Sequence, residues 1–178
     1  MERPVNVWKA NLTNGLILGL IGIIFNLVLY FLDLSLNKNM GWIFSVLLIG
    51  LIFYFIKSYR DNYLHGYITF GQAVGAGVVI CFYYAIISAL FTYVLYTYID
   101  PGLSEKLLIQ SEELLIKRGT PESAIGPALE MMKKFQKPWI IAISTIFNTM
   151  IMGTIISLIV SIFIKREGNP LLDDPSIQ

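Results

Sequence analysis

The chain has 178 residues, of which 56% are hydrophobic and only 14% are charged. Soluble domains carry about 25% charged residues, so this chain lacks the polar side chains that would cover a water-facing surface. The formal net charge is +1 and the 13 basic residues are scattered, which excludes the concentrated basic patch that nucleic-acid binding requires. We therefore expect a single membrane domain over residues 1–178, with the lipid bilayer as its solvent.

Two uncharged apolar segments come first in the chain, at about residues 11–32 and 41–56. A helix rises about 1.5 Å per residue and the hydrocarbon core is about 30 Å thick, so the first segment can cross it and the second is near the lower limit. The first segment is longer than the apolar part of a signal peptide, and no small-residue cleavage site follows it. We therefore expect it to be retained as a span.

Two more uncharged segments follow, at about residues 70–98 and 139–164. All four runs are continuous rather than alternating, which favours helices over the strands of a membrane barrel. Amphipathic rings favour the headgroup level, and tryptophans stand at or just before the starts of three segments: Trp8, Trp42 and Trp139.

The stretch between the third and fourth segments, residues 103–136, has the pattern of two amphipathic helices. Leucines recur at helical spacing up to Leu115, and a second apolar stripe runs to Phe135. Between them, Gly119 and Thr120-Pro121 are typical of a helix end followed by a helix start. The expected fold class is all-α: a polytopic membrane protein with a bundle of four transmembrane helices. Between helices three and four we expect an amphipathic helical hairpin that lies on the membrane or on the bundle.

The positive-inside rule gives these spans an orientation. The side that holds both termini carries basic residues close to span ends: Arg3, Lys9, Lys57, Arg60, Lys165 and Arg166. The other side carries Lys38 and the basic residues of the long loop. Three of these loop residues are close to the fourth segment and reduce the difference in positive charge between the two sides: Lys133, Lys134 and Lys137. We expect a multi-pass protein of the cell inner membrane with both termini in the cytoplasm.

Small residues recur along one sector of several spans. Candidate helix-packing positions are Gly15 and Gly19 in the first segment, Gly71 and Gly75 in the third, and Gly153 in the fourth, and the third segment repeats the spacing with Ala73 and Gly77. Small residues allow helix backbones to approach closely, so that dispersion and weak hydrogen bonds act at short range. Packing within the chain and a homodimer face are both open interpretations, because such motifs occur in either setting.

Three amides lie within the spans. Asn26 and Asn148 are deep in the first and fourth segments, and Gln72 is near the start of the third. A buried amide needs hydrogen-bond partners, so we expect Asn26 and Asn148 each to face another helix. Interhelical hydrogen bonds and a polar path for a substrate are alternative interpretations of these residues.

Charged residues stand at the ends of the spans and not within them. Arg60, Asp61 and Asp100 are interpreted as interfacial charges, although Arg60 could instead bind a lipid phosphate or pair with an acid from another loop. The four apolar cores contain no Asp, Glu, His, Lys or Arg, and a lone His65 with Cys81 inside a span makes no metal site. We expect no catalytic residue, no cofactor and no metal, and hence a protein that is not an enzyme.

Several short motifs resemble those of one membrane-protein family. They are Tyr59-Arg60-Asp61-Asn62, Gly66-Tyr67-Ile68-Thr69-Phe70-Gly71-Gln72-Ala73, Ile99-Asp100-Pro101 after the third segment, and Met131-Met132 in the acidic, Met-rich hairpin. With the four-span layout they resemble the domain of unknown function 4199 over almost the whole chain. The resemblance implies a small inner-membrane protein of a kind found mostly in Bacteroidota. It implies no activity, because none is established for the family.

Two functional hypotheses follow. The lack of a catalytic cluster and the structured outer hairpin favour a non-enzymatic scaffold or partner of an envelope component. The alternative is a subunit of an oligomeric transporter or channel, because four spans are few for a transporter and several copies would be needed. The expected partners are the lipid bilayer and either further copies of the chain or an envelope protein, with no nucleic acid.

Overall fold

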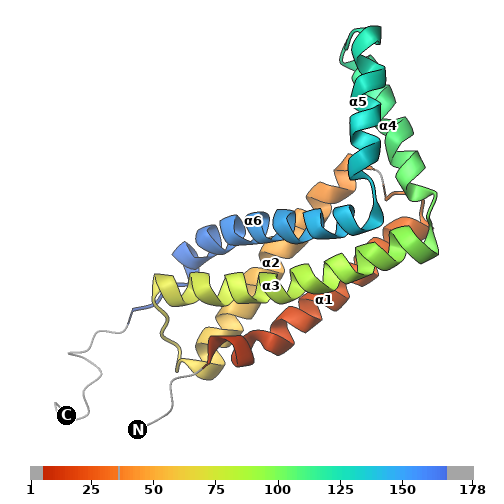
Figure 1. Cartoon of the computed structure of the whole chain (residues 1–178). Coiled ribbons are helices and arrows are strands. Elements are labelled where there is room, and N and C mark those ends of the chain that lie inside the picture. Colours follow the sequence, from red (N-terminus) through yellow and green to blue (C-terminus); the bar gives the residue numbers. More distant parts are fainter. Residues whose placement is uncertain (1–5, 36, 168–178) are drawn as a thin grey trace, which may run out of the picture.

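The computed structural model describes residues 6–35 and 37–167, and almost all of its regular structure is helical (Figure 1). No strand occurs in this part of the chain, where one isolated antiparallel bridge joins Ile68 and Arg166. The elements in chain order are α1 (Val7–Phe31), α2 (Lys38–Tyr63), α3 (Phe70–Val94), the short π-helix η1 (Leu95–Ile99), α4 (Leu103–Lys117), α5 (Glu122–Phe135) and α6 (Pro138–Ile164).

Four helical stretches are long and apolar enough to cross a membrane: Val7–Phe31, Asn39–Tyr63, Phe70–Ile99 and Pro138–Ile164. Two further helices, α4 and α5, lie between the third and the fourth of them. The predicted fold class, an all-α membrane bundle with a helical hairpin, is therefore confirmed.

The second helix is longer than the expected segment of residues 41–56, because it runs on through Lys57 and Arg60 to Tyr63. The segment expected from the sequence ends where charged residues begin. Charged residues mark the edge of the hydrocarbon, however, and a helix can continue beyond that edge. The first helix likewise begins at Val7, because the side chain of Asn6 accepts hydrogen bonds from the first free backbone amides.

The central element of the bundle is α3, which lies between α1 and α6 and has its widest contacts with them (Figure 1). The buried face of α3 follows helical spacing and is rich in small residues, with Ala73, Ala76, Gly77, Ile80 and Cys81 among them. A helix covered on more than one side needs small residues, because its neighbours approach its backbone closely. The second helix contacts α1, α3 and α6, and completes the core with Ile52 and Ile56.

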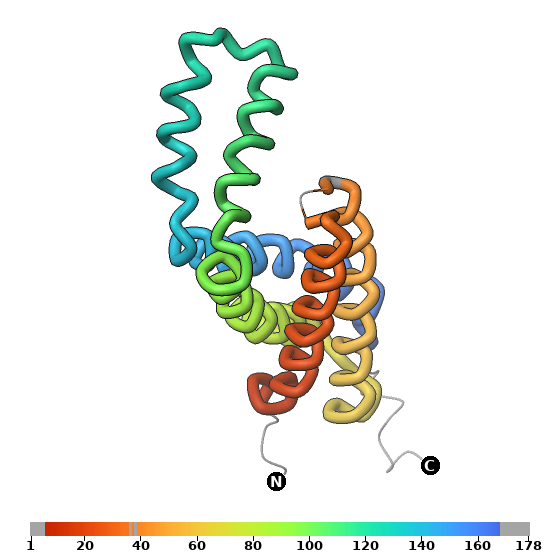
Figure 2. Tube along the Cα trace, turned by 90° about the vertical axis from the view of Figure 1, so that its right-hand side faces the viewer, coloured from red at the N-terminus to blue at the C-terminus, as the bar shows by residue number. Residues whose placement is uncertain are grey.

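The α4–α5 hairpin projects away from the four long helices (Figures 1 and 2). Its two helices contact each other more than they contact the bundle, and no residue of α5 is buried. The hairpin therefore does not lie on the bundle, which was one of its two expected positions; the other, on the membrane surface, stays a prediction. Helix α5 starts one residue later than expected, since Pro121 is its capping residue.

Gly119 makes the turn of the hairpin. Its φ is +72°, and the backbone amides of Gly119 and Thr120 donate to the carbonyls of Ile116 and Leu115, at 2.9 and 3.1 Å. These bonds satisfy carbonyl groups that the end of α4 would otherwise leave free. The glycine predicted as a helix stop has this role in the structure.

Gly119→Ala is expected to destabilise the hairpin by about 1 kcal/mol, because a Cβ is disfavoured in the left-handed region. The matched control is Gly126→Ala within α5, where an added Cβ meets nothing within 4 Å. Because Pro127 follows, the usual gain of about 1 kcal/mol for alanine in a helix is offset by the restriction on the residue before a proline. Amide hydrogen exchange of α4 and α5 should become faster in the first variant and change little in the second. Equal exchange in both variants would mean that the turn conformation does not limit opening of the hairpin.

Candidate functional site

Three predicted packing glycines lie at the contacts of α3 with its neighbours. A Cβ added at Gly15 would lie 2.5 Å from the Cβ of Tyr83, and one at Gly19 would lie 2.6 Å from Cδ1 of Ile87. On the other side of α3, a Cβ at Gly153 would lie 2.6 Å from both Cβ and Sγ of Cys81. A side chain at any of these positions would force a shift: the facing Ile87 side chain would have to move for Gly19, and the short-range contacts with the Cβ atoms of Tyr83 and Cys81 would push on the helix itself for Gly15 and Gly153.

The other predicted pair, Gly71 and Gly75, does not contact a helix. A Cβ added at either position meets nothing within 4 Å. The small residues of α3 that face the core are Ala73 and Gly77 instead, which also stand four apart but on another side of the helix. A glycine pair at the right spacing does not by itself tell which side of its helix is covered.

The three predicted amides lie far apart, and no polar path joins them. Gln72 is at the start of α3, where its side chain accepts from the Thr69 amide at 3.0 Å and completes a capping box. Asn26 is near the opposite end of the bundle, where its side-chain amide donates to the Gly22 carbonyl at 2.8 Å. Asn148 is exposed on α6, on the side that faces away from the bundle. Asn148 thus faces no other helix of the described chain, contrary to our expectation, whereas Asn26 lines a groove with residues of α2, although its side-chain amide is bonded to its own helix.

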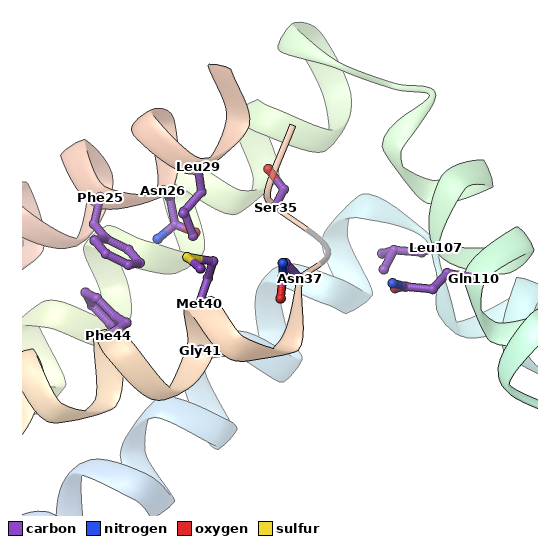
Figure 3. A pocket seen from close by; sticks show the side chains of 10 residues that line it. All are labelled: Phe25, Asn26, Leu29, Ser35, Asn37, Met40, Gly41, Phe44, Leu107 and Gln110. Atoms are coloured by element: carbon purple, nitrogen blue, oxygen red, sulfur yellow. The ribbon is translucent and has the colours of Figure 1, made fainter. Parts of the chain in front are cut away.

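Asn26 helps to line an open groove between the α1–α2 turn and α4 (Figure 3). The groove has a volume of about 340 Å³, and its polar members besides Asn26 are Ser35, Asn37 and Gln110. A ring pair, Phe25 and Phe44, forms one wall with centroids 4.8 Å apart. None of the described side chains that line the groove is ionisable, and they offer hydrogen bonding and apolar contact. No local sequence pattern predicts this groove, because its residues come from three separate segments of the chain.

The predicted interfacial charges Arg60 and Asp61 belong to a cluster that we name the terminal lock: Arg60, Asp61, Ile68, Ile164 and Arg166. Nε of Arg60 donates to Asp61 at 2.7 Å, and its Nη1 donates to the Ile164 carbonyl at 3.3 Å. Ile68 and Arg166 exchange two backbone hydrogen bonds of 2.9 Å. The terminal lock thus ties the α2–α3 turn to the end of α6.

The α2–α3 turn bends sharply where the terminal lock begins. His65 and Gly66 have φ values of +54° and +85°, and the Gly66 amide donates to the Arg60 carbonyl at 3.1 Å. The guanidinium of Arg166 lies over the Tyr67 ring, 5.6 Å from its centroid, in a cation–π contact. The two family motifs at residues 59–62 and 66–73 therefore lie at or beside this turn, which gives them a structural role.

Asp100 fixes the base of the hairpin. Its carboxylate accepts from the Lys106 ammonium at 3.0 Å, and its carbonyl accepts from the Leu103 amide at 3.1 Å. The Asp100 hydrogen bond and charge raise the pKa of Lys106 above its ordinary value. An exposed pair of this kind adds little stability, but it links the turn that follows η1 to the first turns of α4.

The four membrane-length helices around a covered α3, together with charges confined to the ends of the spans, define a multi-pass α-helical membrane protein. A family model described as protein of unknown function DUF4199 matches residues 13–166, and the chain belongs to this family. Comparison with curated proteins and with solved structures gave no match.

Proposed function

We propose that the chain is a non-enzymatic membrane protein that holds another envelope component through its α4–α5 hairpin. The observation that carries this proposal is the apolar surface of a hairpin that stands clear of the bundle (Figure 2). Met131 is 63% exposed, and three further apolar side chains of the hairpin are also exposed: Ile109, Ile116 and Phe135. Helices of 15 and 14 residues are too short to span a bilayer, and we propose that a protein partner, rather than the membrane surface, covers these apolar side chains.

A groove near the tip of the hairpin indicates the chemistry of the partner. It has a volume of about 550 Å³ and combines Ile116, Ile125 and Leu129 with the carboxylates of Glu112 and Glu122. A groove lined by apolar side chains and two carboxylates fits an amphipathic segment that carries basic side chains. By contrast, the scattered positions of Asn26, Gln72 and Asn148 give no support to a transport path.

We further propose that the protein lies in the inner membrane with both termini in the cytoplasm. The end of the bundle where α1 begins and α6 ends carries Lys9, Lys57, Arg60, Lys165 and Arg166, as the positive-inside rule requires. This orientation places the hairpin on the outer side of the membrane. A reporter fused after Gln178 that is active only in the periplasm would reverse the orientation.

The hairpin proposal is tested by Met131→Ser combined with Phe135→Ser. Loss of these two exposed apolar side chains should lower the yield of a protein crosslinked to the hairpin in native membranes by about tenfold, because apolar anchors contribute most of the energy of such contacts. The yield is measured by affinity purification and mass spectrometry, with a photoreactive residue at Ile109.

The matched control is Glu130→Ser combined with Lys134→Ser, two exposed positions one residue earlier on the same helix. The control should leave the yield unchanged. If the unmodified hairpin crosslinks only to lipid, or if both double variants lose the product equally, the scaffold role is rejected.

A further inference from the structure

Asn148 lies in the part of α6 that must be surrounded by hydrocarbon. It stands about 15 Å along the axis from Pro138, in a helix of 27 residues, so its amide is near the middle of the bilayer. The side chain is exposed, and nothing in the described part of the chain hydrogen-bonds to it. An amide that faces lipid without partners is costly, because hydrocarbon offers neither donor nor acceptor.

Asn148 belongs to a regular stripe along α6. Exposed residues recur there in alternating steps of four and three, and we name them the α6 stripe: Ser144, Asn148, Ile151, Ile155, Leu158 and Ile162. The four apolar members are between 41% and 61% exposed. The buried residues of α6 lie on the opposite side of the helix: Gly153, Ile156, Ser157, Val160, Ser161 and Ile164.

The spacing of the α6 stripe is that of a coiled-coil seam. Apolar residues that repeat every 3.5 positions keep one side of a helix against a partner helix over several turns. A single asparagine in such a seam fixes the register and the number of helices, because it must meet a polar group at its own level. The stripe therefore fits another helix better than it fits fluid lipid.

We propose that the α6 stripe is the contact between two copies of this chain in the membrane. Two copies inserted in the same orientation are related by an axis along the membrane normal, so their α6 helices run parallel and identical residues meet at the same depth. Asn148 then faces Asn148 of the second copy. An amide carries both a donor and an acceptor, so the two side chains satisfy each other, which an unrelated apolar helix cannot do.

The proposed dimer contact does not involve the hairpin, because the stripe lies on α6 alone. It is tested first by Asn148→Leu, which keeps an apolar seam but removes the amide. Energy transfer between separately labelled copies of the purified full-length chain in lipid vesicles should show dimerisation weakened about three- to tenfold. Asn148→Gln, which retains the amide, should keep most of the dimerisation of the unmodified chain. Unchanged energy transfer in Asn148→Leu would overturn the role of Asn148.

The second test compares neighbouring positions at almost equal depth. Single cysteines replace Ile151 or Ile162 in the stripe, and Phe147 or Phe163 on its flanks, where the phenylalanines are 67% and 75% exposed. The native Cys81 is buried and is left in place. Oxidation in vesicles should crosslink the stripe variants and leave the flank variants monomeric. Equal crosslinking at stripe and flank positions, or none at any of them, would overturn the proposed dimer.

Discussion

Gly153→Leu is expected to destabilise the helix bundle by about 2–3 kcal/mol, because it adds a side chain where α6 lies against α3. A Cβ alone would come within 2.6 Å of Cys81, and α3 and α6 share the widest contact of the fold. Overpacking of this kind costs about 1–3 kcal/mol, and the larger part of this range is expected where the neighbour is a short side chain next to the backbone of another helix. The free energy of unfolding is measured by denaturant titration in detergent micelles, followed by tryptophan fluorescence.

Gly75→Leu is the matched control for this experiment. It places the same side chain at a glycine of α3, but an added Cβ there meets nothing within 4 Å. The free energy of unfolding should change by less than about 0.5 kcal/mol, or rise slightly because leucine is the better helix former. If both variants lost stability equally, the assigned rotation of α3 would be wrong, and so would its assigned neighbours.

This contrast shows what the sequence could predict about the fold. The spans could be found because hydrocarbon demands long uncharged runs, and the hairpin could be found because Gly119 and the spaced leucines are local signals. The difference between Gly153 and Gly75 is not local. It depends on how far each helix is rotated about its own axis, which is set by the packing of all four helices together.

The same limit applies to the polar residues. Asn26 and Asn148 have similar surroundings in the sequence, yet one lines a groove beside the α1–α2 turn and the other faces outward from α6. Arg60 and Asp61 are neighbours in the chain, so their ion pair could be expected. The carbonyl that Arg60 also reaches is 104 positions away, and no short motif can encode that contact.

Arg60→Leu is expected to lower the free energy of unfolding by about 1–3 kcal/mol and to loosen the terminal lock. The guanidinium is the one side-chain group in the described chain that holds both Asp61 and the last turn of α6. A sheltered hydrogen bond from a charged group contributes about 1.5–3 kcal/mol, and the bond to Ile164 is the partly buried one, since the Arg60 side chain is 15% exposed and that of Asp61 is 43% exposed. The backbone amides of Ile68 and Arg166 should then exchange at least fivefold faster with solvent.

Arg60→Lys separates charge from geometry in this experiment. Lysine keeps the positive charge but cannot point two fixed donors at a carboxylate and a carbonyl, so we expect about half of the loss seen with leucine. Lys57→Leu removes a nearby exposed charge from the same helix and should change the stability by less than about 0.5 kcal/mol. If Arg60→Lys retained full stability, the lock would depend on charge alone. If Lys57→Leu lowered the free energy of unfolding as much as Arg60→Leu, the stability of this contact would depend on the positive charge at this end of the bundle and not on the two hydrogen bonds of the Arg60 guanidinium.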